Sequence, residues 1–115
     1  MSLFERAAPR PGGFREIGVR EVATGLHGAR LVDVREVGEY RGELGHAPGA
    51  ELVPLASVPL RASEWRRDQE FVLICRSGRR SEQAALTLLR LGFHKVVNVA
   101  GGMLAWQEHG LPVER

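Results

Sequence analysis

The sequence has little of the two residue types from which small proteins build cross-links and metal sites. It contains one cysteine, Cys75, and four histidines that are scattered along the chain. One cysteine cannot form an internal disulfide, and neither residue type recurs at the spacing of metal ligands. We therefore expect no metal and no disulfide, which fits a reducing compartment. Nothing in the sequence implies a cofactor.

Long hydrophobic runs and a strong net charge are also absent. No stretch approaches the roughly 18 apolar residues that a membrane-spanning helix needs, and Glu5 interrupts the region where a secretory signal would be apolar. Sixteen basic residues against fourteen acidic ones leave a formal net charge of +2, which does not indicate a nucleic-acid partner. We expect a cytoplasmic protein that binds neither membranes nor nucleic acids.

The motifs of several large enzyme classes are missing as well. Neither G-x-G-x-x-G nor G-x4-G-K-[ST] occurs, so no dinucleotide or phosphate loop is predicted. The G-x-S-x-G elbow of many serine hydrolases is absent too. The double glycine Gly101-Gly102 is therefore interpreted as a tight turn.

What is present suits one globular domain. The chain has 115 residues, of which 43% are hydrophobic, enough for one core. Residues 1–13 contain prolines and glycines without any periodicity and are predicted to be a flexible arm. In residues 14–115 strand-like apolar runs alternate with helix-like segments, which predicts a single three-layer α/β/α domain with a mainly parallel sheet.

The most informative stretch surrounds the cysteine. Four consecutive large apolar residues, Phe71–Ile74, predict a strand that is buried on both faces, and residues 82–91 predict a helix. Cys75 lies between them, where the strand ends. The first backbone N–H groups of a helix have no partner within the helix, so they can stabilise an anion in the preceding loop.

The composition of this loop favours a thiolate. Arg76, Arg79 and Arg80 add positive charge, and Gly78 permits a tight backbone turn. Together with the backbone N–H groups, they are expected to lower the pKa of Cys75 from ~8.5 toward or below neutrality. A lone cysteine at a strand end is more often a small buried hydrophobe, but here the loop makes a nucleophile the better interpretation.

The run Cys75-Arg76-Ser77-Gly78-Arg79-Arg80-Ser81 resembles the active-site loop of single-domain rhodaneses, the thiosulfate sulfurtransferase family. The resemblance covers roughly residues 14–112 and implies a five-stranded sheet with helices on both sides. It also implies that Cys75 is catalytic and carries sulfur as a persulfide. The loop would bind a small anionic donor such as thiosulfate. The candidate substrate-binding residues are Arg76, Ser77, Gly78, Arg79, Arg80 and Ser81.

These loop residues are expected to contribute in different ways. Arg76 and Arg80 would contact the anion, whereas Arg79 would face solvent. Ser77 to Ser81 would contribute chiefly backbone N–H groups.

Three further segments resemble family signatures: residues 33–36, residues 45–50 and residues 100–106. From the residues alone, Asp33 and Arg35 favour an ion-paired turn at a strand end, and His46 favours a structural hydrogen bond. We expect these three residues to shape the pocket rather than to react. Residues 41–44 lie where many family members are shorter, so the pocket rim is expected to differ.

The resemblance implies a sulfurtransferase that passes sulfur from thiosulfate, or a similar donor, to cyanide or to a low-molecular-weight or protein thiol. Two alternatives stay open. One is a non-enzymatic or relay module that hands persulfide sulfur to a protein partner. The other, less favoured, is phosphatase or arsenate reductase chemistry, for which related folds use a C-x5-R loop. In this sequence Ser81 occupies the arginine position and Arg80 falls one residue early.

Overall fold

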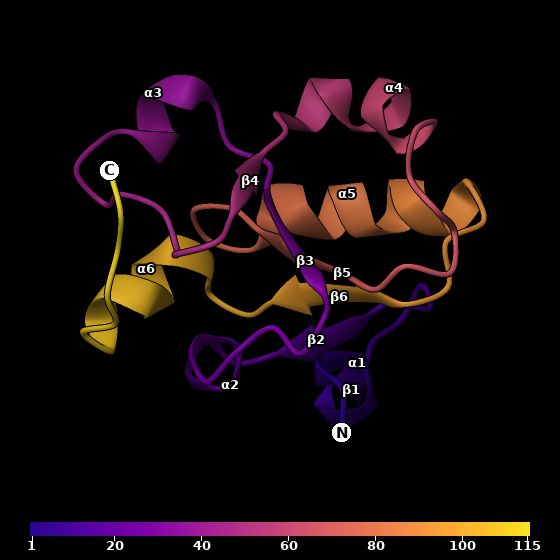
Figure 1. Cartoon of the computed structure of the whole chain (residues 1–115), viewed down its shortest axis with the longest axis horizontal. Helices are drawn as coiled ribbons and strands as arrows, with labels where there is room; N and C mark the ends of the chain where they lie inside the picture. Colours follow the sequence, from indigo (N-terminus) through magenta and orange to yellow (C-terminus); the bar gives the residue numbers. More distant parts are fainter.

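The computed structural model describes all 115 residues and contains one sheet of six strands with helices on both faces (Figure 1). The strands, in the spatial order β1-β2-β6-β5-β3-β4, are β1 (Ala8–Pro9), β2 (Arg15–Ile17), β6 (Val96–Val99), β5 (Phe71–Ile74), β3 (Arg30–Asp33) and β4 (Glu51–Leu52). The helices are α1 (Leu3–Arg6), α2 (Val19–Ala23), α3 (Val37–Tyr40), the 3-10 helix η1 (Leu55–Ser57), α4 (Val58–Ala62), α5 (Arg79–Arg90) and α6 (Gly102–Glu108). The predicted α/β/α class and mainly parallel sheet are confirmed, because only β1 pairs antiparallel with its neighbour.

The strand β5 separates two hydrophobic cores. Its four residues are fully buried, and their side chains alternate between the two faces of the sheet. Val72 and Ile74 belong to the core under α1, α2 and α6, whereas Phe71 and Leu73 belong to the core under α4 and α5. Figure 1 shows these two groups of helices on opposite sides of the sheet. Burial on both faces explains why this strand has no polar alternation.

The N-terminal segment, predicted from the sequence to be a flexible arm, contains a short helix and a short strand in the structure. Ser2 begins α1 with a capping box, in which its hydroxyl accepts from the Glu5 N–H at 3.1 Å and its own N–H donates to the Glu5 carboxylate at 2.8 Å. Leu3 is fully buried, and β1 adds a sixth strand at the sheet edge, one more than expected. A single helical turn and a two-residue strand are too short to leave a detectable period in the sequence.

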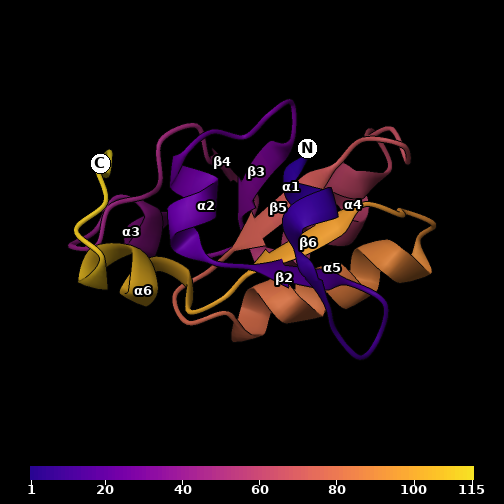
Figure 2. The ribbon, with the colours of Figure 1, turned by 90° about the horizontal axis from the view of Figure 1, so that it is seen from below.

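The carboxyl ends of the central parallel strands meet at one edge of the sheet. Asp33 is paired with Ile74, and Leu73 is paired with Asn98, so the segments that follow β3, β5 and β6 are neighbours. Figures 1 and 2 both show α3, α6 and the C-terminus at the end of the molecule where the β5–α5 loop lies. Ligands of open α/β sheets bind at such an edge, and Cys75 lies there.

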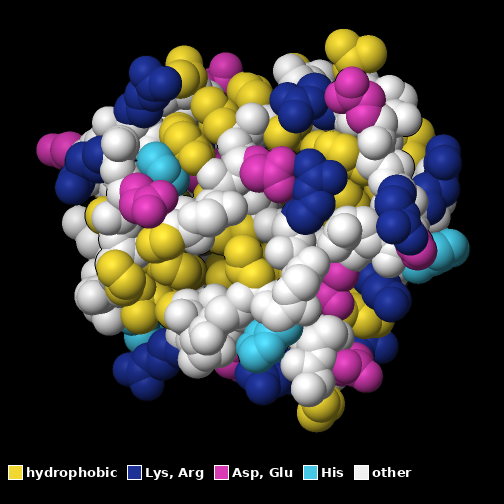
Figure 3. All heavy atoms as spheres, viewed as in Figure 1, with side chains coloured by type: hydrophobic (Ala, Val, Ile, Leu, Met, Phe, Trp, Pro, Cys, Tyr) yellow, Lys and Arg dark blue, Asp and Glu magenta, His cyan; other side chains and the backbone are white.

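Helix length and surface charge are two general features of the molecule. The longest helix, α5, has 12 residues, and none of the helices is long and apolar enough to cross a membrane. Basic and acidic side chains are interspersed on the face shown in Figure 3. This face therefore presents no large patch of one charge.

Candidate active site

Cys75 lies at the bottom of a cradle formed by the β5–α5 loop. Cys75 is only 1% exposed, and the Gly78 N–H donates to the Cys75 Sγ at 3.1 Å. Gly78 has a φ of +104°, a left-handed conformation that side chains disfavour. The helix α5 begins at Arg79, three residues earlier than the sequence indicated, so its first N–H groups face the cradle.

The pKa of Cys75 is lowered, and hydrogen bonds account for the direction. Burial raises the pKa, but the Ser81 hydroxyl and the backbone N–H groups of Ser81, Gly78 and Ser77 together lower it by more. The lowering therefore comes from the cradle. The arginines, to which the sequence interpretation gave a share, are not among the main causes.

The first turn of α6 locks the loop from the opposite side. The Met103 N–H donates to the Cys75 carbonyl at 2.8 Å, and the Leu104 N–H donates to the Arg76 carbonyl at 3.0 Å. Gly102 has a φ of +54°, and a Cβ there would collide with the Cys75 carbonyl and lie 2.6 Å from that of Arg76. The double glycine is thus the predicted tight turn, and its second member permits the close approach of two backbones.

A buried polar network on the inner side of the loop was missed by the sequence interpretation. The Ser81 Oγ lies 3.4 Å from the Cys75 Sγ and also bonds the Oδ1 of Asn98 on β6. The Asn98 Nδ2 donates to the Gly78 carbonyl at 3.3 Å and to the Glu16 carboxylate at 3.1 Å. The available signal was a single amide in the otherwise apolar strand Val96–Val99.

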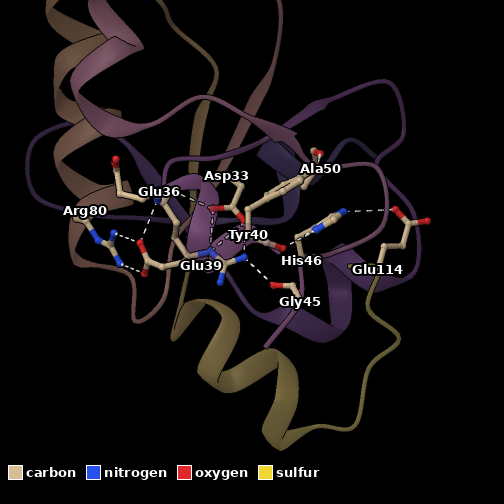
Figure 4. Close-up of polar contacts among 10 residues, drawn as sticks. Asp33, Glu36, Glu39, Tyr40, Gly45, His46, Ala50, Arg80 and Glu114 are labelled. Atoms are coloured by element: carbon tan, nitrogen blue, oxygen red, sulfur yellow. Dashed lines mark hydrogen bonds and ion pairs between the residues drawn. The ribbon is translucent and has the colours of Figure 1, made fainter. Parts of the chain in front are cut away.

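The three arginines of the loop have different surroundings. Arg80 forms two hydrogen bonds with Glu39, at 2.7 and 2.8 Å, and Figure 4 shows the two side chains facing each other. The Arg80 guanidinium lowers the pKa of Glu39 to about 2, against the opposing effect of partial burial. Arg76 and Arg79 are exposed and form no ion pair.

Asp33 and Arg35 form the ion-paired turn that the sequence predicted. Both are buried, and the Arg35 guanidinium donates to the Asp33 carboxylate at 2.8 to 3.1 Å. The same guanidinium donates to the Gly45 carbonyl at 2.7 Å, so it ties the end of β3 to the segment that contains His46.

His46 has the surroundings of a structural residue. Its ring stacks on Tyr40 with 3.6 Å between centroids, and its Nδ1 lies 2.8 Å from the Tyr40 carbonyl oxygen. Its Nε2 lies 3.8 Å from the Glu114 carboxylate, and its backbone pairs with Glu114 (Figure 4). These contacts hold the C-terminal segment and give His46 the structural hydrogen bond that the sequence favoured, while its role in shaping the pocket stays a prediction.

A cleft of about 690 Å³ opens beside the loop. Part of its wall comes from residues 42–44, within the stretch 41–44 for which the sequence predicted a different pocket rim. Its lining residues are Arg35, Gly38, Glu39, Gly42, Glu43, Leu44, Arg76, Leu104 and Gln107. Arg76 is thus the loop arginine that borders the cleft.

Comparisons with known proteins identify the architecture. The family model described as "Rhodanese-like domain" matches residues 19–109. A sulfurtransferase of Allochromatium vinosum is 42% identical over 83 residues, which cover 72% of this chain and 76% of that protein. The putative sulfur carrier protein YrkF of Bacillus subtilis is 49% identical over 76 residues, 66% of this chain but only 40% of YrkF. The crystal structure of a rhodanese-related protein from Thermoplasma volcanium superposes with a TM-score of 0.77 at 28% identity, covering 88% of this chain and 98% of that one.

Proposed function

The chain belongs to the rhodanese-like domain family, and on this premise we propose that it is a sulfurtransferase in which Cys75 carries the sulfur as a persulfide. The observation that supports this most directly is the cradle around the Sγ, where backbone N–H groups and a hydroxyl converge on one sulfur atom. Such groups stabilise a thiolate and, after transfer, a persulfide anion.

The first half of the reaction loads the sulfur. The Cys75 thiolate attacks the outer sulfur of thiosulfate and forms a new S–S bond. The S–S bond of the donor breaks, and sulfite leaves with the bonding electron pair. Arg76 is the cation best placed to hold the donor, because it borders the cleft and no carboxylate is paired with it.

The second half unloads the sulfur. A nucleophile such as cyanide or a thiolate attacks the terminal sulfur of the persulfide, and the Cys75 thiolate leaves with the electrons of the broken S–S bond. The enzyme returns to its starting state, so the order is ping-pong.

The size of the cleft favours a second role, that of a relay. A cleft of about 690 Å³ is in the range that holds a drug-sized ligand, which is far larger than thiosulfate. It has room for a low-molecular-weight thiol or a segment of a protein acceptor. The relative named as a putative sulfur carrier is compatible with such a role.

Phosphatase chemistry is disfavoured by the same loop. Ser81 stands where the C-x5-R loop has its arginine, and it is buried and bonded to Asn98. Arg80 is held by Glu39. Neither residue therefore supplies a free guanidinium at the position that clamps a phosphate.

Intact-mass measurement after exposure to thiosulfate tests the proposal. The wild type is expected to gain about 32 Da, the mass of one sulfur atom, and to lose it again when cyanide or a thiol is added. Cys75→Ser is the matched control and is expected to gain nothing and to lack thiosulfate:cyanide transfer. The absence of an adduct on the wild type, together with aryl phosphatase turnover that disappears in Cys75→Ser, would overturn the assignment.

A further inference from the structure

The Ser81 hydroxyl has one proton and two potential acceptors. Its Oγ bonds the Asn98 Oδ1 in a short contact and lies 3.4 Å from the Cys75 Sγ. A hydroxyl donates only one hydrogen bond at a time. The Ser81 proton must therefore point either to the amide oxygen or to the sulfur.

The orientation of the Asn98 amide is fixed by its surroundings. Its nitrogen faces two oxygens that can only accept, the Gly78 carbonyl at 3.3 Å and the Glu16 carboxylate at 3.1 Å. Its oxygen therefore faces Ser81, because the reverse orientation would place oxygen against oxygen on both of those contacts. An amide oxygen attracts the Ser81 proton more strongly than a neutral thiol sulfur, which is a weak acceptor.

We propose that Asn98 is a positioning residue that controls the direction of the Ser81 hydroxyl proton during sulfur transfer. When Cys75 is a neutral thiol, the proton points to the Asn98 Oδ1. When Cys75 is a thiolate, the proton turns to the Sγ, and the buried Oδ1 loses a partner. This inference rests on the proposed function for its place in the reaction.

The movement of the Ser81 proton between Asn98 and Cys75 also affects the stability of the persulfide. After the sulfur is loaded, the negative charge moves from the Sγ to the terminal sulfur, where the loop N–H groups can reach it. The Ser81 proton then returns to Asn98. When the acceptor removes the terminal sulfur, the proton turns back and stabilises the departing thiolate. Asn98 thus stabilises the loaded state relative to the free thiolate.

Burial makes this competition significant. Cys75, Ser81 and Asn98 are each at most 1% exposed, so water does not replace a lost partner. No buried side-chain nitrogen or oxygen in the structure lacks a hydrogen-bond partner. Ionisation of Cys75 therefore leaves the Asn98 Oδ1 without its hydrogen bond from Ser81, and this loss makes the ionisation less favourable.

A double-mutant cycle on Ser81 and Asn98 tests the proposal. The pKa of Cys75 is measured from the pH dependence of its alkylation by iodoacetamide in four proteins: wild type, Asn98→Leu, Ser81→Ala and the double variant. Leucine is close to asparagine in size but accepts no hydrogen bond. Every variant keeps the surrounding charged groups, which are the pairs Arg80–Glu39 and Arg35–Asp33, together with Glu16, Arg76 and Arg79.

The expected result is specific to the serine. The effect of Asn98→Leu on the pKa of Cys75 is measured once with Ser81 present and once in the Ser81→Ala background. We expect the effect with Ser81 present to be more negative by about half a unit or more. Loss of the Asn98–Gly78 contact would loosen the loop equally in both backgrounds, so it cancels in the cycle. The proposal would be overturned if Asn98→Leu shifted the pKa of Cys75 equally in the two backgrounds, or if it raised this pKa only when Ser81 is present.

Two further features keep the test decisive. Asn98→Ala, which adds no bulk, is carried through the same cycle, so a failure of the leucine variant to fold does not end the test. Alkylation needs no sulfur donor, whereas persulfide formation is followed by mass. A failed cycle with a normal sulfur adduct would therefore reject the role of Asn98 alone, and a lost adduct with the expected cycle would reject sulfur transfer.

Discussion

Arg80 and Glu39 face each other across two hydrogen bonds, from Nη1 to Oε2 at 2.7 Å and from Nη2 to Oε1 at 2.8 Å. This pair joins the first turn of α5 to α3, and thereby connects the Cys75 loop to the wall of the cleft. It also engages the guanidinium that the sequence suggested would contact the donor. The unpaired positive charge at the mouth of the cleft is left to Arg76.

This division of roles predicts different effects of the loop arginines on the donor. Arg76→Ala is expected to raise the apparent KM for thiosulfate about tenfold, the scale of a lost charge-assisted contact of ~1.5 kcal/mol. Arg80→Ala is also expected to raise it, because Glu39 would be left unpaired near the donor. Steady-state kinetics with cyanide as acceptor provide the measurement.

Arg79→Ala is the internal control for that series, since Arg79 is exposed and lies outside the cleft lining. It is expected to change the KM less than either neighbour. A tenfold effect at Arg79 with none at Arg76 would contradict the assignment of the donor contact.

The same ion pair predicts a pH dependence of stability. The pKa of Glu39 is lowered to about 2 from a usual 4.5, so the stabilisation is present above pH 4.5 and is lost as the pH falls toward 2. Because about a third of each side chain is exposed, screening reduces the contribution to roughly 1 kcal/mol.

Urea unfolding of the wild type and Glu39→Gln measures this contribution. The difference between their free energies of unfolding is expected to be largest near pH 7 and to shrink below pH ~4.5. A difference that stays constant down to pH ~2.5 would contradict the linkage.

The buried pair Asp33–Arg35 predicts a larger loss of stability. Asp33→Ala leaves the Arg35 guanidinium, which is 1% exposed, without its carboxylate. Removing one partner of a buried ion pair typically costs about 3–5 kcal/mol, and urea unfolding is expected to show a loss of that order. Asp68→Ala is the matched control, because Asp68 pairs with Arg66 on the surface, and it is expected to change stability little.

The sequence predicted the fold class and the position of the cysteine because both leave strong local signals. The unbroken apolar run Phe71–Ile74 requires burial on both faces, and the arginine-rich and glycine-containing stretch after it indicates an anion-binding turn. The structured segment 1–13 left no such signal. The helix and strand of this segment depend on tertiary contacts, such as the burial of Leu3, which the local sequence pattern does not encode.

The inner side of the site was beyond prediction for a related reason. Asn98 reaches the loop, and Glu16 reaches Asn98, only because β2, β6 and β5 are neighbours in the sheet, and strand order is a non-local property. The pairing of Arg80 with Glu39 likewise joins residues 41 positions apart. An arginine in an active-site loop is therefore only a candidate for anion binding. Whether its guanidinium is free depends on carboxylates that can lie far away in the sequence.

The close approach at Gly102 predicts the most damaging small substitution. Gly102→Ala would drive a methyl group into the Cys75 and Arg76 carbonyls at a φ of +54°. We expect a loss of about 3 kcal/mol or more in stability, together with loss of sulfur transfer. Thermal unfolding and the cyanide assay measure the two effects.

Gly18→Ala is the comparison for Gly102→Ala. Gly18 has a φ of −82° and no atom within 4 Å of a Cβ added there. It is expected to leave both stability and activity near the wild-type values. Equal tolerance at the two glycines would show that the loop does not depend on its contact with α6.

That contact between α6 and the loop also has a consequence for the order in which the protein acquires reactivity. The carbonyls of Cys75 and Arg76 receive their partners from Met103 and Leu104, which a ribosome adds nearly 30 residues later. A nascent chain that has just exposed its cysteine therefore lacks the lock that shapes the cradle. The thiol of the unfinished chain is therefore expected to lack the hydrogen bonds that favour its thiolate until synthesis has passed α6, so that activation of the cysteine is coupled to completion of the fold.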